Sequence, residues 1–268
     1  VSDSSHRRAE AGAGRLARLL DGFDRERALL TLALRGVPSE ALRSVDVQVT
    51  DLASPRGRAA PFTAMLPFFV IMAVLYGALN AALDTTAGER ERGSLEPLLT
   101  NPAAPWALAL GKWAAVAAVA MLIALLGVAS LLPARWLIRS ETLRALFVFG
   151  PAEAAAFLAL LLPLATSLSA LMMALAIRAR TVKEAQASSA LLILAVSLAP
   201  LVAIVDPAGD RPWYPWVPAL AQHALMNRVL RGEPLGAAEV AVPLLVGALL
   251  TLLCLADLAR RLKGAARG

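Results

Sequence analysis

The chain has 268 residues, of which 58% are hydrophobic and 17% are charged, and its mean hydropathy is +0.64. A typical soluble domain is nearer half apolar and a quarter charged, so this composition excludes an average soluble domain and points to a membrane protein. The net charge of +6 is compatible with loops that face anionic lipid, and no nucleic-acid-binding motif accompanies it. We therefore expect no nucleic-acid partner.

Residues 1–58 form a polar, nearly neutral segment. Gly22–Leu34 has the pattern of a helix, and the alternating valines of Ser44–Leu52 are typical of a short strand. Residues 1–20 contain basic side chains but no apolar signal-peptide core. We expect a small, solvated, external segment of α/β structure rather than a binding domain.

Runs without acidic or basic residues predict transmembrane helices, because about 20 apolar residues cross the hydrocarbon layer. Five such runs occur, the last of which needs its flanking residues to reach that length: Ala59–Leu83, Trp113–Ala134, Ala154–Ile177, Ala185–Val205 and Val240–Ala256. The expected fold is therefore an all-α membrane protein with five transmembrane helices in this chain. A soluble bundle would need several unusually long core helices.

Basic residues in short loops indicate the orientation of the spans. One side receives loops 84–112 and 178–184 and the C-terminal tail, which together hold every lysine of the chain. The other side receives loops 135–153 and 206–239, which hold fewer basic residues. The first side is expected to be cytoplasmic, with residues 261–268 as a cytoplasmic tail.

Five spans place the two termini on opposite faces, yet nothing in the sequence would export residues 1–58. We expect that a further N-terminal span belongs to the native chain, which would then have six. The alternative is a true five-span protein that starts at a GTG codon read as Val1.

Motifs for catalysis and metal binding are missing from the sequence. Gly111–Trp113 supplies Gly-Lys without the Ser or Thr of a phosphate-binding loop, and Gly12–Ala17 fits a dinucleotide fingerprint with no strand before it. His6 and His223 are far apart in the sequence, and Cys254 is the single cysteine. We expect no enzyme activity, no catalytic or metal-ligating residue, and no cofactor bound by this chain.

The five apolar runs contain no carboxylate, which argues against a proton-coupled secondary transporter. Some polar residues do occur in them. We interpret these as helix-packing contacts rather than substrate ligands, and the substrate-binding residues stay unassigned: Asn80, Thr166, Ser167, Ser169 and Gln186.

The densest polar stretch follows the first run, where alternating charges begin at Glu89. Continued as a helix, Glu89, Arg92 and Glu96 would share one face at spacings of three and four. Glycines and prolines interrupt the stretch, so a short, bent, amphipathic element along the cytoplasmic interface is expected, with Trp106 as an interfacial anchor. An ordinary solvated turn is the alternative.

Ala87–Leu99, followed by Pro102 and Gly111-Lys112, resembles the signature of the type-2 ABC export permeases, and is most similar to their sodium-efflux branch. The likeness spans about residues 45–260, and its specific part is residues 84–112. It implies a permease domain at residues 59–260 that includes a cytoplasmic coupling element at 84–104. It also implies a multi-pass protein of the bacterial inner membrane.

The resemblance implies that the coupling element docks on a separate ABC ATPase subunit, which would bind ATP and Mg. The implied ATPase-coupling residues are Gly88, Glu89, Arg90, Glu91, Arg92, Gly93, Ser94 and Glu96. Loop 178–184 supplies secondary candidates, for which positive-inside anchoring is the alternative: Arg178, Arg180, Lys183 and Glu184. The other implied partner is a second permease, as a homodimer or heterodimer.

The expected function is that of the membrane-spanning permease subunit of an ATP-driven exporter, with sodium as the leading substrate. An autonomous secondary transporter and a non-transporting membrane scaffold are the alternatives. The late external stretch Asp206–Pro234 predicts an interfacial or re-entrant helix around Ala219–Leu230, because its prolines forbid a plain span. His223 in that helix is expected to be a surface or interface histidine.

Overall fold

The computed structural model describes residues 16–24, 26–27, 31, 63–94, 97, 104–137, 147, 149–198, 202 and 213–265. The chain divides into two compact units, Val1–Ala60 and Pro61–Gly268. In the first unit, residues 16–24 are helical, which overlaps the start of the helix predicted at Gly22–Leu34. The strand predicted at Ser44–Leu52 lies outside the described residues.

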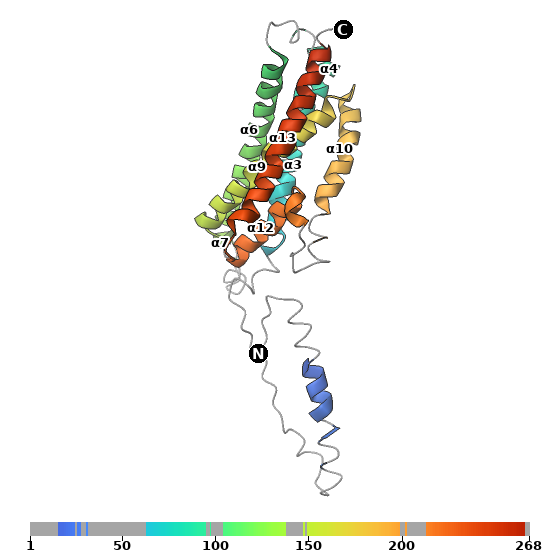
Figure 1. Cartoon of the computed structure of the whole chain (residues 1–268). Coiled ribbons are helices and arrows are strands. Elements are labelled where there is room, and N and C mark those ends of the chain that lie inside the picture. The colour runs from blue at the N-terminus through green and yellow to red at the C-terminus, as the bar shows by residue number, and fades with distance from the viewer. Residues whose placement is uncertain are drawn as a thin grey trace. The chain divides into compact units, whose positions relative to one another are not determined.

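The second unit is a bundle of long helices (Figure 1). Its described part contains helices only, which confirms the all-α class. In chain order these elements are α3 (Leu66–Thr85), α4 (Ala87–Glu91), α6 (Pro105–Leu131), α7 (Ala134–Leu137), α9 (Pro151–Ala176), α10 (Val182–Ser197), the 3-10 helix η2 (Tyr214–Trp216), α12 (Leu220–Arg231) and α13 (Ala237–Ala265).

Four helical segments of the described chain are long and apolar enough to cross a membrane: Leu66–Glu91, Pro105–Leu131, Pro151–Ala176 and Ala237–Gly264. They correspond to the first, second, third and fifth predicted spans. The fourth prediction, Ala185–Val205, overlaps α10, whose 16 residues cover about 24 Å. The rest of that run lies largely outside the described residues, so the count of five spans is approximate.

Charged residues extend the helices beyond the charge-free runs. α6 begins at Pro105, a residue suited to the first helical position, and includes Lys112. The predicted span began only after that lysine, at Trp113. α13 likewise continues through Asp257 to Ala265. The sequence-based boundaries were therefore too short at these ends, because a charged residue near the end of a span does not have to end its helix.

α9 is the central helix of the bundle and packs against α3, α6, α10, α12 and α13. Its largest side chains are fully buried: Phe157, Leu161, Leu164, Met172 and Met173. α6 and α13 expose leucines such as Leu126 and Leu245, which is the pattern of helices that face lipid. Lipid is as apolar as leucine, so close packing rather than the hydrophobic effect has to hold such helices together.

Figure 1 shows α4 and the end of α13 at one end of the bundle and α7 and α12 at the other. The ion pair between Arg178, just after α9, and Asp257 of α13, with 3.1 Å between Nη2 and Oδ2, lies at the α4 end. This arrangement agrees with the topology in which loops 84–112 and 178–184 share a side with the C-terminus. Which side is cytoplasmic stays a prediction.

α13 approaches the backbone of α9 closely at Gly247. A Cβ atom on Gly247 would lie 3.1 Å from the carbonyl oxygen of Pro163, which is backbone and cannot turn aside. A Cβ atom added to Gly127 on α6 would have no such neighbouring atom within 4 Å.

Gly247→Val should therefore force α13 away from α9 and lower the free energy of unfolding by about 1–3 kcal/mol. Gly127→Val is the matched control, because it adds the same side chain to a helix position with open space. Thermal unfolding in detergent compares the two, and equal losses in both variants would contradict a close contact at Gly247.

Candidate coupling surface

The short helix α4 is separated from α3 by a break at Thr86, whose backbone angles are non-helical (φ −128°, ψ −83°). The Thr85 hydroxyl donates to the Ala81 carbonyl at 2.8 Å, so a side chain competes for the backbone acceptors at the end of α3. α4 ends at Glu91, and Gly93 then adopts the left-handed conformation, with φ +70°. The Gly93 amide donates to the Arg90 carbonyl at 3.1 Å, which closes the helix end.

The helix therefore does not continue from Glu89 to Glu96, and the single face proposed for Glu89, Arg92 and Glu96 is not formed within α4. Glycine favours the left-handed backbone that ends the helix at this point, and residues with a side chain rarely adopt it. Glu96 itself lies outside the described residues.

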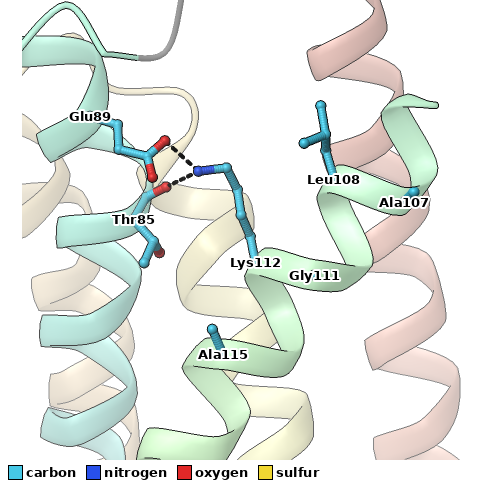
Figure 2. A pocket seen from close by; sticks show the side chains of 7 residues that line it. All are labelled: Thr85, Glu89, Ala107, Leu108, Gly111, Lys112 and Ala115. Atoms are coloured by element: carbon cyan, nitrogen blue, oxygen red, sulfur yellow. Dashed lines mark hydrogen bonds and ion pairs between the residues drawn. The ribbon is translucent and has the colours of Figure 1, made fainter. Parts of the chain in front are cut away.

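Glu89 faces the bundle and forms an ion pair with Lys112 of α6 (Figure 2). The Lys112 ammonium also donates to the backbone carbonyl of Thr85 at 2.8 Å. Side-chain exposure is 10% for Lys112 and 24% for Glu89. The pair is therefore shielded from water, and loss of one partner would leave the other as a poorly solvated charge.

Arg90 and Glu91 bind the turn between α9 and α10. The Arg90 guanidinium donates to the Ala179 carbonyl at 2.8 Å. The Glu91 carboxylate accepts the Val182 amide at 2.9 Å. Val182 is the first residue of α10, so the carboxylate lies at the positive end of that helix.

Arg92 returns to the end of α3, where it donates to the side chain and the backbone carbonyl of Asp84, both at 3.0 Å. These side chains are mostly exposed, so the contact adds little stability. Gly88 lies next to the Arg92 side chain. A Cβ atom on Gly88 would be 3.3 Å from the Arg92 guanidinium and 3.2 Å from the Leu83 carbonyl oxygen. The absence of a side chain at Gly88 lets Arg92 fold back.

The structure brings the described members of the primary and secondary site residues, which exclude Glu96, together at one end of the bundle. We call their water-exposed members the polar face: Glu91, Arg92, Gly93, Ser94, Arg178, Arg180, Lys183 and Glu184. Glu184 accepts the Arg180 amide at 2.8 Å, and its own amide donates to the Thr181 hydroxyl at 3.2 Å, which caps α10. Sequence reasoning did not count Lys112, Asp84 and Asp257 among the site residues. Their respective partners Glu89, Arg92 and Arg178 are distant in sequence or lie across a helix break.

Lys112→Met should leave the Glu89 carboxylate without its partner and lower the free energy of unfolding by about 1–3 kcal/mol. Lys183→Met is the control, since Lys183 is an exposed lysine near the same end of the bundle. Glu89→Gln added to Lys112→Met should recover part of the loss. If Lys112→Met melted at the same temperature as Lys183→Met, the ion pair between Glu89 and Lys112 would not stabilise the position of α4.

At the opposite end, α12 confirms the helix predicted around Ala219–Leu230. The prediction for His223 is wrong, because this side chain is only 3% exposed. It hydrogen-bonds to the backbone of Ala64 before α3 and lies 3.3 Å from the Asn227 amide nitrogen. Burial lowers the pKa of His223 from its usual 6.5 to about 4, although the Ala64 bond acts in the other direction. The imidazole is therefore neutral at pH 7.

Because His223 resists protonation in the folded chain, the unfolded chain binds more protons between pH 6.5 and about 4. Acidification through this window should lower the free energy of unfolding by on the order of 1.4 kcal/mol per pH unit. His223→Gln should flatten the slope between pH 6.5 and 5, while His6→Gln, at the other histidine of the chain, should keep it. Identical slopes in both variants would refute the buried neutral imidazole.

The long apolar helices define a multi-pass membrane protein. At one end of the bundle, an ion pair and hydrogen bonds hold the short helix α4 in place. The chain belongs to the ABC-2 family of transporter proteins, whose sequence profile matches residues 29–258. It is 26% identical over 219 residues to the ABC transporter permease protein NatB of Bacillus subtilis strain 168, which covers 80% of this chain. The chain spans about half the length of that relative, 56%. No solved structure is significantly similar to the chain.

Proposed function

We propose that this chain is the membrane-spanning permease subunit of an ATP-driven ABC exporter, and that α4 with the polar face is where a separate ATPase subunit docks. The family membership and the similarity to an ABC transporter permease protein support this function. ATP and Mg would be bound by the ATPase subunit. The proposed location is the bacterial inner membrane, as one half of a homodimer or heterodimer of permeases.

The observation that carries the proposal is the set of hydrogen bonds and ion pairs that hold α4 against the bundle. The five-residue helix contacts α6 through Glu89 and the start of α10 and the turn before it through Arg90 and Glu91. Arg92, which follows the helix, contacts the end of α3. A displacement of α4 would therefore act on several membrane helices at once. A solvated turn between two spans has no need of such contacts.

The contacts also divide the predicted coupling residues into two groups. Glu89 and Arg90 are directed into the bundle and would transmit movement rather than touch the ATPase. Arg92, Ser94 and Lys183 are exposed and belong to the surface that a partner could reach. Complementary charges on the ATPase would give this surface its specificity.

Sodium is the first substrate to test, because the segment 84–112 resembles the sodium-efflux branch of the type-2 export permeases. The apolar runs lack carboxylates, so a cation would have to be bound by hydroxyl and carbonyl oxygens or at the interface with a second permease.

The test is co-purification of the full-length chain with a phosphate-loop ATPase encoded beside it, followed by the ATPase rate in liposomes. Arg92→Glu/Lys183→Glu reverses two charges of the polar face without touching Glu89, and should weaken binding at least tenfold. Arg18→Glu is the control, since it reverses the charge of one exposed arginine in the first unit.

Loss of binding and of ATPase stimulation in the double variant, with both retained in Arg18→Glu, is the expected result. If no ATPase bound even the wild-type chain, the exporter function would be wrong. Sodium flux without an ATPase would then indicate a secondary transporter, and no flux at all would indicate a scaffold.

A further inference from the structure

The C-terminal half of α9 contains a buried hydroxyl that forms no hydrogen bond, unlike those of its neighbours. Among the described residues, Ser169 Oγ is the buried side-chain oxygen or nitrogen that forms no hydrogen bond. Such an unsatisfied group costs free energy and requires a physical explanation.

Other helical serines of this chain show what Ser169 would be expected to do. Their hydroxyls donate to a backbone carbonyl three or four residues earlier, as Ser167 does to Leu164 at 3.0 Å and Ser189 does to Ala185 at 2.9 Å. For Ser169 the carbonyl four residues earlier is that of Ala165, and the acceptor three residues earlier is the carbonyl of Thr166.

That acceptor is already occupied by a residue of another helix. The indole nitrogen of Trp113, on α6, donates to the Thr166 carbonyl at 3.0 Å. The second lone pair of that oxygen serves the amide four residues further on, as in any α-helix. Trp113 therefore occupies one of the two carbonyl positions that the Ser169 hydroxyl could use, the one three residues earlier.

We propose that the Thr166 carbonyl is the shared acceptor of a two-position hydrogen-bond switch between α6 and α9. Trp113 holds the carbonyl in the arrangement seen here, and Ser169 takes it when α6 moves along α9. The hydroxyl of Ser169 then replaces the bond that Trp113 gives up, so both positions of α6 leave the carbonyl satisfied.

The place of Trp113 in the sequence connects this switch to α4. Lys112 and Trp113 are adjacent on α6, and successive helical residues point about 100° apart. Lys112 pairs with Glu89 of α4, while Trp113 reaches the middle of α9. In this inference, which rests on the proposed function, Trp113 is a positioning residue through which displacement of α4 reaches the centre of the bundle.

The switch can be tested by thermal unfolding of the purified full-length chain, without any ATPase. Ser169→Ala removes an unsatisfied hydroxyl and should raise the melting temperature by about 2 °C. Ser167→Ala is the matched control, a buried serine on the same helix whose hydroxyl is bonded, and it should not raise the melting temperature.

The decisive comparison repeats Ser169→Ala in a Trp113→Phe background, which keeps an aromatic ring and removes the N–H donor. Ser169 should occupy the free carbonyl there, so Ser169→Ala should now lower the melting temperature. This reversal of sign supports the switch. Effects of Ser169→Ala that are equal in the two backgrounds would overturn it.

A second readout addresses the link to transport. In liposomes with the ATPase subunit, Ser169→Ala and Trp113→Phe should each reduce ATP-driven turnover about threefold to tenfold with ATPase binding unchanged. Unchanged turnover would overturn the positioning role. Failure of any ATPase to bind would refute the proposed function, while the thermal comparison would still decide the hydrogen-bond switch.

Discussion

A lysine on a membrane-spanning helix needs a counter-charge or access to water, and Lys112 has the Glu89 carboxylate and the Thr85 carbonyl as its partners. These contacts connect the first turns of α6 to α4 and to the end of α3 (Figure 2). α4 has five residues, far fewer than a helix needs to be stable by itself. Its order therefore depends on the contacts that the bundle provides.

The bundle in turn depends on α9, which contacts the other long helices of the unit. Pro163 lies within α9 and has no N–H to donate to the carbonyl four residues earlier. The carbonyl of Pro163 itself accepts the hydroxyl of Thr166 at 3.1 Å. Gly247 lets α13 approach the same carbonyl, and Trp113 joins α6 to α9 one turn further on. The centre of the membrane unit is thus held by close packing and by bonds to backbone oxygens, with no buried ion pair of the described residues at this depth.

The apolar runs predicted most of the spans, because charges are expensive in hydrocarbon and therefore mark the limits of a run. The same rule misplaced the start of α6. It treats Lys112 as an end, whereas Glu89, which is distant in sequence, keeps that lysine inside the helix. The burial of His223 was equally hidden, because the Ala64 backbone that it contacts is distant from it in the sequence.

The charge motif was recognisable in the sequence, and it was the three-dimensional contacts that the sequence left open. The spacing of Glu89, Arg92 and Glu96 is a helical pattern, but the left-handed Gly93 ends the helix before that pattern is completed. Local periodicity predicts which residues could share a face. It does not include the backbone conformation of the residue between them.

The order of signs in the sequence Glu89-Arg90-Glu91-Arg92 follows from what each side chain meets. Consecutive helical residues lie about 100° apart, so four of them reach all sides of α4 and cannot all face a partner protein. Glu89 meets an ammonium group, and Arg90 meets a carbonyl just beyond the negative end of α9. Glu91 meets an amide at the positive end of α10, and Arg92 meets the Asp84 carboxylate. Reversal of any one sign would replace an attraction with a repulsion, so an alternating motif that looks like a recognition sequence also meets the electrostatic requirements of the fold.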